Sequence, residues 1–174
     1  KTERNFHSCE NLKFVCVSRL VKWKGLDELI LIFRNIEWAE LGIIGDGPEL
    51  ENLIKLKKKN SVSNIKILGQ KTLKQVHEIL EQSDVFILNS YYEGLSHSLL
   101  EASMYALPMI VRNSGGNSEV VKNNQNGFLY NNSEQILYLI EKIRDKKLRE
   151  KFSINSRMIY EERFNNLNTY SKYI

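Results

Sequence analysis

Short apolar runs alternate with amphipathic runs along most of the chain, and this alternation constrains the fold more than any other feature. The apolar runs have the length of buried strands, and the runs between them place apolar residues at helical spacing. One such face, in residues 26–33, consists of Leu26, Leu29, Ile30 and Phe33. Alternating strands and helices favour βαβ units. We therefore expect a Rossmann-like, doubly wound α/β domain, with a mostly parallel six-stranded sheet and helices on both faces.

The expected strands and helices can be placed along the chain. The strands cover residues 12–18, 41–45, 64–69, 84–89, 108–112 and 126–130. Helices are expected at 26–33, 73–82, 134–144 and 147–162, and others begin near Pro48 and Ser98. Thr72 and Ser133 are predicted N-caps, and a tail through Tyr170 follows the last helix.

Size, charge and cysteine content narrow the class of protein. A chain of 174 residues fits one domain, and no apolar run approaches the roughly 20 residues that span a bilayer. Cys9 and Cys16 make a poor disulfide framework, and Cys16 lies in an apolar run, so we expect a core thiol in a cytoplasmic protein. The net charge of +4 includes a basic run, Lys55–Lys59. This run suits a helix C-terminus; contact with the inner face of an anionic membrane is the alternative, and no nucleic-acid partner is expected.

The loops that follow the expected strands carry most residues that suggest chemistry. These loops are residues 18–25, 45–48, 69–72, 90–97 and 113–118. In a doubly wound sheet they meet at one edge, where ligands bind. The loop 18–25 places Arg19, Lys22 and Lys24 just before Gly25. Such cations suit a phosphate, although a solvated basic loop is the alternative. Without a Gly-x-Gly-x-x-Gly or Walker pattern, a dinucleotide-binding protein or P-loop NTPase is disfavoured.

The stretch from Tyr91 to Pro108 contains two glutamates, Glu93 and Glu101, at the junction of a loop and a helix. Ser98 and Glu101 match a capping box, with Ser98 as N-cap. The same helix start would present free N–H groups, which suit a phosphate group. A diphosphate held between these N–H groups, Arg19 and Lys24 accounts for more of the pattern than a helix cap does.

Other candidate residues have ordinary structural alternatives. Gly45-Asp-Gly-Pro48 is either a tight turn or a close approach to a ligand, and Ser114–Glu119 is a second glycine-rich loop before a helix. His97 is either a proton carrier or a surface residue, and His7 and His77 are expected at the surface. No His/Cys/Asp cluster has metal-ligand spacing, so we expect no bound metal.

These features, in this order, resemble the C-terminal, donor-binding domain of the group-one (family four) retaining glycosyltransferases, which have the two-domain B-type fold. The resemblance covers roughly residues 12–130. The matching segments are Ser18–Gly25, Ile44–Pro48, Ile67–Gly69, Glu93–Ser96, Leu100–Ala102, Pro108–Val111, Gly115–Gly116, Glu119–Val120 and Gly127.

The resemblance implies a nucleotide-diphosphate sugar as donor and a role for each site residue. Arg19 and Lys24 would hold the diphosphate and stabilise its growing charge, and Glu93 would contact the sugar. The first amides of the helix would cradle the phosphates, and Glu101 would accept hydrogen bonds from the ribose. The further expected donor-site residues are Gly45, Gly69, Gln70, Lys71, Gly94, Leu95, Ser96, His97 and Ser98, with the base near residues 69–71. Ser96 and Ala106 stand where the family often has glycine.

The resemblance also implies a missing N-terminal acceptor domain. The chain opens with Lys1 and its first methionine is Met104, so we expect residues 1–174 to be the donor half of an enzyme and inactive alone. The expected function is retaining transfer of a sugar, from a UDP-sugar first, to a glycan or lipid-linked acceptor, without a cofactor. A non-catalytic nucleotide-sugar binding module that needs a partner chain is the alternative. A glycoside hydrolase with Glu93 and Glu101 as an acid and base pair is disfavoured, since it leaves the basic loop unexplained.

Overall fold

The computed structural model describes residue 6 and residues 11–165. In this part of the chain, β1 (Leu12–Val17), β2 (Ala39–Ile44), β3 (Ile65–Gly69), β4 (Val85–Leu88), β5 (Met109–Arg112) and β6 (Gly127–Tyr130) form one sheet. Their order is β3-β2-β1-β4-β5-β6, and every neighbouring pair is parallel. The predicted Rossmann-like class and the six strands are confirmed, and the sheet is parallel throughout.

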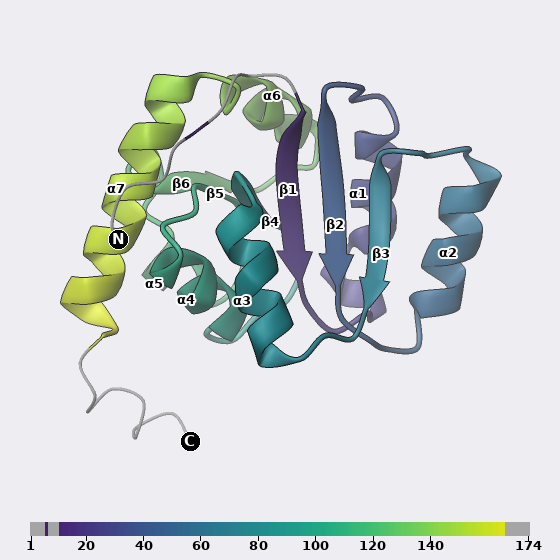
Figure 1. The fold of residues 1–174 in the computed structure, drawn as a ribbon, viewed down its shortest axis with the longest axis horizontal. Helices are drawn as coiled ribbons and strands as arrows, with labels where there is room; N and C mark the ends of the chain where they lie inside the picture. Colours follow the sequence, from purple (N-terminus) through teal and green to yellow (C-terminus); the bar gives the residue numbers. More distant parts are fainter. Residues whose placement is uncertain (1–5, 7–10, 166–174) are drawn as a thin grey trace.

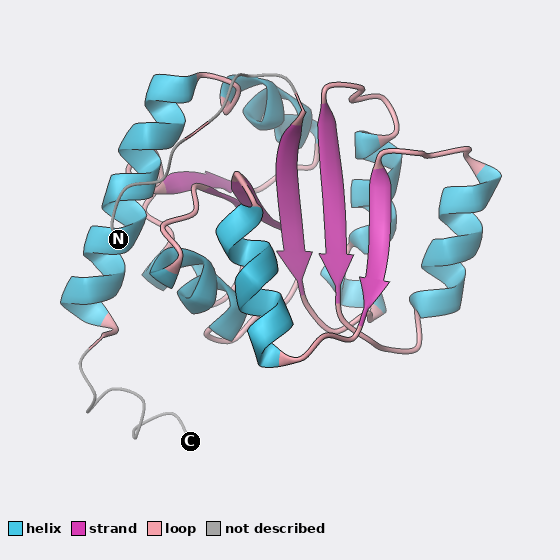
Figure 2. Ribbon diagram, in the orientation of Figure 1, coloured by secondary structure: helices cyan, strands magenta, loops and turns pink. Residues whose placement is uncertain are grey.

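Helices cover both faces of this sheet. They are α1 (Leu26–Phe33), α2 (Leu50–Lys59), α3 (Leu73–Gln82), α4 (His97–Met104), α5 (Asn117–Val120), α6 (Glu134–Lys142) and α7 (Lys146–Arg163), with a short 3-10 helix η1 (Lys22–Lys24) before α1. Figure 1 shows α3 in front of the sheet and α1 behind it. Figure 2 shows that loops connect the arrow ends of β1, β2 and β3 to the next helices along one edge. The doubly wound arrangement places the residues after each strand at that edge.

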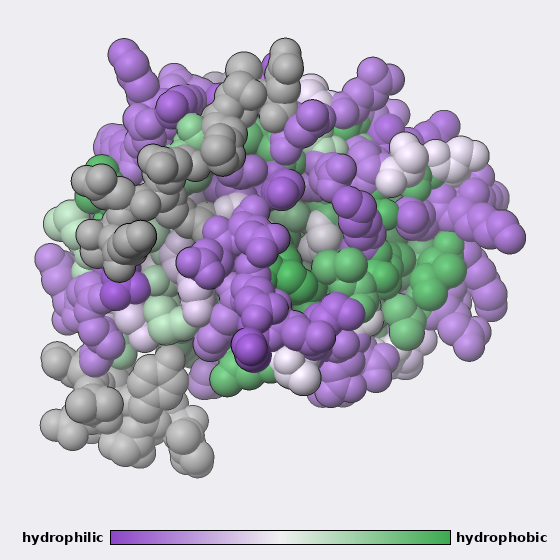
Figure 3. Space-filling model, in the orientation of Figure 1, coloured by the Kyte–Doolittle hydropathy of each residue, from purple (hydrophilic) through white to green (hydrophobic). Residues whose placement is uncertain are grey.

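The core follows from the apolar runs in the sequence. All four residues of β4 and all four of β5 are buried, as expected for central parallel strands covered on both faces. Phe14 and Phe33 pack edge to face, with ring centroids 5.1 Å apart, which fixes α1 against β1. On the face of the molecule that Figure 3 shows, hydrophobic residues gather over β2 and β3, inside a largely hydrophilic rim.

Cys16 is fully buried, as predicted. Burial raises the pKa of its thiol to about 12, so the group stays protonated and serves as a small core residue. Cys9, His7 and the tail residues 166–170 lie outside the described residues. Within the described part, no helix combines the length and the apolar character that crossing a membrane requires.

Three predicted helix starts have different outcomes. Thr72 is the N-cap of α3, and it forms a capping box in which the Gln75 N–H donates to Thr72 Oγ1 at 3.3 Å. The start at Pro48 is wrong, because α2 begins at Leu50 after a turn in which the Glu49 N–H donates to the Leu20 carbonyl at 3.0 Å. Ser133 stands at the N-cap position of α6 but makes no side-chain cap bond; its hydroxyl accepts a hydrogen bond from Arg112 instead.

Candidate functional site

The loops at the carboxyl edge of the sheet are tied to one another by hydrogen bonds. The Leu20 N–H donates to the Asp46 carbonyl at 2.8 Å, and the Tyr91 N–H donates to the Trp23 carbonyl at 2.8 Å. The Ser114 hydroxyl donates to the Ser90 carbonyl at 2.7 Å. Segments that are far apart in the sequence therefore form one connected edge, as the strand pattern predicts.

Glycines permit the close approach of these loops. A Cβ on Gly45 would lie 1.8 Å from the Ser18 carbonyl oxygen, and one on Gly115 would lie 1.7 Å from the Glu93 carbonyl oxygen. Gly115 also has a φ of 51°, which favours glycine. Both glycines are thus required by packing between loops, and a contact of Gly45 with a ligand stays a prediction.

Two predicted catalytic residues, Lys24 and Glu93, form an ion pair at this edge. Their side chains are only 14% and 10% exposed, respectively. Lys24 ends η1, and Gly25 follows it in the left-handed conformation with a φ of 58°. The fold therefore brings a cation from the loop after β1 to a carboxylate from the loop after β4, where solvent screens them only in part.

The other predicted cations and the base region are more open. Arg19 is exposed, and its side chain makes no hydrogen bond or ion pair with any residue that the structure describes. Gln70 is exposed and Lys71 is half-buried. A Cβ on Gly69 would meet no atom within 4 Å, and the same holds for Gly94. These positions leave room for a ligand, and their contacts with one stay predictions.

The start of α4 differs from the predicted capping box. The helix begins at His97 with Ser96 as N-cap, and Ser96 makes no side-chain cap bond. The prediction of Ser98 as N-cap is wrong, because the Ser96 carbonyl already accepts the Leu99 N–H at 3.1 Å. The N–H groups of His97 and Ser98 are the first of the helix and have no intrahelical carbonyl partner. They are the donors that a phosphate would meet.

Glu101 does not reach back to the helix start, and it makes no hydrogen bond or ion pair within the described residues. Burial raises the pKa of Glu101, and the nearby charges of His77 and His97 oppose this shift. His97 is exposed, which agrees with its interpretation as a surface residue. His77 is half-buried, and its ring centroid lies 5.2 Å from that of Tyr105. Glu101 is therefore a shielded carboxylate whose acceptor oxygens are available.

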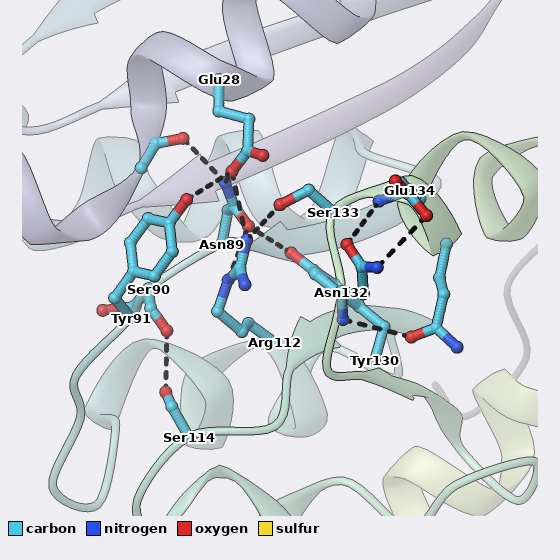
Figure 4. Close-up of polar contacts among 12 residues, drawn as sticks. Glu28, Asn89, Ser90, Tyr91, Arg112, Ser114, Tyr130, Asn132, Ser133 and Glu134 are labelled. Atoms are coloured by element: carbon cyan, nitrogen blue, oxygen red, sulfur yellow. Dashed lines mark hydrogen bonds and ion pairs between the residues drawn. The ribbon is translucent and has the colours of Figure 1, made fainter.

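A polar network that includes Tyr91, two residues before Glu93, escaped the sequence analysis (Figure 4). It is centred on Arg112 at the end of β5, which is 7% exposed. Arg112 donates to Asn89 Oδ1 at 3.0 Å and to Glu28 Oε2 at 3.1 Å. Tyr130 donates to the same Asn89 oxygen at 2.6 Å. Arg112, a charged residue at the end of an otherwise apolar strand run, was a signal in the sequence of a buried polar group, but the run does not indicate which residues it contacts.

Electrostatics within the network favour the charged form of Glu28. Partial burial pushes the pKa of Glu28 upward, but hydrogen bonds from Ser133, Asn89 and Tyr91 and the charge of Arg112 more than offset it. The net result is a pKa below the ordinary value, so Glu28 is ionised at neutral pH. No group of His, Cys, Asp and Glu side chains in the described part of the chain has the arrangement to hold a metal ion.

The chain is a doubly wound domain whose carboxyl sheet edge carries cations, a helix start with unpaired N–H groups, and two acidic side chains. The family model described as Glycosyl transferases group 1 matches residues 2–158. The chain therefore belongs to the group 1 glycosyltransferases, as the sequence motifs indicate.

Two curated relatives illustrate the range of this family. One is the UDP-Gal:alpha-D-GlcNAc-diphosphoundecaprenol alpha-1,3-galactosyltransferase of Escherichia coli, 35% identical over 120 residues, which are 66% of this chain and 30% of the relative. The other is the GDP-mannose-dependent alpha-(1-6)-phosphatidylinositol monomannoside mannosyltransferase of Mycobacterium tuberculosis, 35% identical over 127 residues, or 66% of this chain and 33% of the relative.

Solved structures share the fold. The crystal structure of Anabaena Alr3699/HepE in complex with UDP superposes with a TM-score of 0.83 at 22% identity, over 94% of this chain and 48% of that chain. At this identity the likeness shows the fold alone. The chain spans less than half the length of the curated relatives it matches.

Proposed function

We propose that this chain binds a nucleotide-diphosphate sugar at the carboxyl edge of its sheet and donates the sugar to an acceptor. The observation that carries the proposal is the shielded ion pair of Lys24 and Glu93, beside a helix start with free N–H groups. A site that holds both a cation for a diphosphate and a carboxylate for sugar hydroxyls suits this class of ligand. Membership in the group 1 glycosyltransferases supports it.

Arg19 and Lys24 are the proposed diphosphate ligands. Arg19 is exposed and unpaired within the described residues, so its guanidinium can grip two phosphate oxygens. Lys24 would leave Glu93, wholly or in part, for a phosphate oxygen. As the bond between the sugar C1 and its phosphate oxygen breaks, negative charge grows on the diphosphate, and both cations stabilise that charge.

The helix start and Glu101 would hold the phosphates and the ribose. The N–H groups of His97 and Ser98 point out of the first turn of α4, and Glu101 lies one turn further along the same helix. Its free oxygens can accept hydrogen bonds from two ribose hydroxyls. Gly69, the last residue of the edge strand β3, would contact the base together with Gln70 and Lys71, which follow it.

Glu93 is assigned to the sugar as a binding group rather than as a nucleophile. In the proposed retaining reaction, the acceptor hydroxyl approaches C1 from the face that the diphosphate leaves, and its proton passes to the departing phosphate oxygen. Glu93 would accept hydrogen bonds from sugar hydroxyls, which orients C1 toward the acceptor. This division of roles accounts for the carboxylate without a covalent intermediate.

UDP is the first candidate nucleotide. The E. coli relative is named for UDP-Gal, and the Anabaena structure of similar fold contains UDP. The M. tuberculosis relative is named for GDP-mannose, so GDP is the principal competitor. Because the chain spans less than half of such relatives, we further propose that an acceptor-binding domain completes the enzyme. On this proposal the donor site works without a metal or other cofactor, and the enzyme acts in the cytoplasm. Contact of the Lys55–Lys59 run with the inner face of an anionic membrane is the alternative role of that run.

Isothermal titration of the purified chain with UDP, GDP and ADP, and then with their sugars, tests the proposal. We expect binding of one nucleotide diphosphate, and tighter binding when its sugar is attached. Absence of binding to all three nucleotides would refute it. The binding-module alternative predicts the same titration, but no sugar transfer even from a protein that also contains the acceptor domain.

A further inference from the structure

We propose that Arg112 and Glu28 are positioning residues for the donor sugar, which they control through Tyr91. The inference rests on the proposed donor site and adds two residues that touch neither nucleotide nor sugar. Together they hold the loop that carries Glu93 against the segment that carries Lys24. The argument starts from the contacts of Arg112 and proceeds outward to the ion pair.

The Arg112 guanidinium joins the ends of three neighbouring strands. It lies at the end of β5 and donates to Asn89, the residue after β4, at 3.0 Å. Its ring contact with Tyr130, the last residue of β6, places the guanidinium carbon 5.3 Å from the ring centroid. It also donates to the Ser133 hydroxyl at 2.8 Å, just before α6. These contacts fix the guanidinium plane in one orientation.

Tyr91 is held between Arg112 and Glu28. The Arg112 guanidinium carbon lies 4.1 Å from the centroid of the Tyr91 ring, and the Tyr91 hydroxyl donates to Glu28 Oε2 at 2.9 Å. The same carboxylate oxygen accepts from Arg112. Although the Tyr91 ring is 53% exposed, one of its faces is stacked and its hydroxyl is bound. Figure 4 shows the three side chains converging from α1, the loop after β4 and the end of β5.

The network reaches both partners of the ion pair through short stretches of backbone. Glu93 lies two residues after Tyr91, whose N–H donates to the Trp23 carbonyl at 2.8 Å, next to Lys24. Asn89 Nδ2 donates to the Gly25 carbonyl at 2.9 Å, on the other side of Lys24. A Cβ on Gly25 would lie 2.6 Å from Asn89 Nδ2, so this approach needs glycine. Lys24 and Glu93 are thus set by the same buried layer.

A purely structural role would not need these charges. The side chains of Arg112 and Glu28 are 9% and 26% exposed. Replacing an ion pair that is largely removed from solvent by apolar side chains of similar volume is often neutral or stabilising, so fold stability alone does not explain the pair. Directed hydrogen bonds specify angles as well as contact. A shift of about 1 Å at a reacting group can cost about 100-fold in rate, so a layer that fixes the geometry of Glu93 would matter for the sugar and little for the nucleotide.

The test measures how much more tightly the protein binds a UDP-sugar than UDP alone, and this ratio of affinities is called the sugar gain. Wild type, Tyr91→Phe and the double variant Glu28→Leu with Arg112→Met are titrated with UDP and with UDP-glucose, UDP-galactose and UDP-N-acetylglucosamine. Tyr91→Phe keeps the ring and loses one exposed hydroxyl, so it folds even if the double variant does not. Tyr138→Phe, at a 65% exposed tyrosine of α6, is the matched control.

We expect both variants to bind UDP within about threefold of wild type, while the gain from the best sugar falls about tenfold. Tyr138→Phe should change neither quantity. An unchanged sugar gain in folded Tyr91→Phe would overturn the positioning role, as would a wild type that binds UDP but gains nothing from any sugar. A wild type that binds neither UDP, GDP nor ADP would instead refute the proposed function on which the inference rests.

Discussion

Lys24 and Glu93 lie 69 residues apart in the sequence and form an ion pair at the carboxyl edge of the sheet. Both side chains are largely shielded from solvent. If Lys24 binds the diphosphate as proposed, the phosphates compete with Glu93 for the lysine, and donor binding loosens this pair.

This competition predicts opposite effects of one substitution. Glu93→Gln removes the competing charge, so UDP alone should bind more tightly, by about tenfold or more, since a hydrogen bond to a charged group is worth about 1.5–3 kcal/mol. The additional affinity for a UDP-sugar over UDP should fall. Both quantities come from titrations of wild type and variant. If Glu93→Gln weakened UDP as strongly as UDP-sugar, the two roles assigned to Lys24 and Glu93 would be wrong.

Glu101→Gln should separate ligand binding from fold stability. The pKa of Glu101 is raised in the folded protein by burial, so its contribution to stability is fully present below the unfolded pKa and is lost as pH rises through the folded pKa. At neutral pH the charged carboxylate lowers stability, and the variant should melt at a higher temperature than wild type. This difference should close near about pH 4.

The same variant should bind UDP about tenfold more weakly at neutral pH, because a hydrogen bond to a charged acceptor is worth about 1.5–3 kcal/mol. In wild type, affinity should fall with decreasing pH as Glu101 becomes protonated. Thermal melts check the predicted stability and titrations check the predicted affinity, both from neutral pH down to about pH 4. If Glu101→Gln melted at a lower temperature than wild type at neutral pH, this account would be wrong, and the capping role predicted for Glu101 from the sequence would be favoured.

Gly94 and Gly115 form a matched pair with opposite expected outcomes. A Cβ on Gly94 meets no atom within 4 Å, so Gly94→Ala should change the free energy of unfolding by less than about 0.5 kcal/mol. It should still weaken UDP binding, because Gly94 is an expected donor-site residue. Gly115→Ala would place a Cβ 1.7 Å from the Glu93 carbonyl at a φ of 51°, and should cost about 2 kcal/mol or more. Urea unfolding and UDP titration distinguish them; equal losses of stability would contradict this account.

Thr72→Ala provides a stability reference away from the proposed phosphate site. It removes the hydroxyl that accepts the Gln75 N–H and should cost about 1 kcal/mol of unfolding free energy. Urea unfolding of wild type and variant measures this loss. An unchanged free energy of unfolding would contradict the stabilising role of the capping box.

The sequence predicted the fold well because each strand and helix is specified locally, by apolar runs such as β4 and by periodic faces such as that of α1. Helix starts were harder, since Ser96 and Ser98 are both acceptable N-caps and the local sequence does not distinguish them. The Arg112 network could not be predicted from local pattern. It depends on the spatial order of β4, β5 and β6 and on the approach of α1, which sequence spacing does not contain. Motifs pointed to Lys24 and Glu93 separately, but only the fold shows that they pair.

The most direct test of the central claim is titration of UDP into wild type, Arg19→Ala and Lys24→Ala, with Arg34→Ala and Lys58→Ala as charge-matched controls. Arg34, the C-cap of α1, donates a hydrogen bond to Asn60, and Lys58 lies exposed in α2, so neither belongs to the proposed site. We predict that wild type and both controls bind UDP alike, while each site variant loses about tenfold or more with its fold intact. Normal binding of UDP by both Arg19→Ala and Lys24→Ala would contradict the assignment of the diphosphate site.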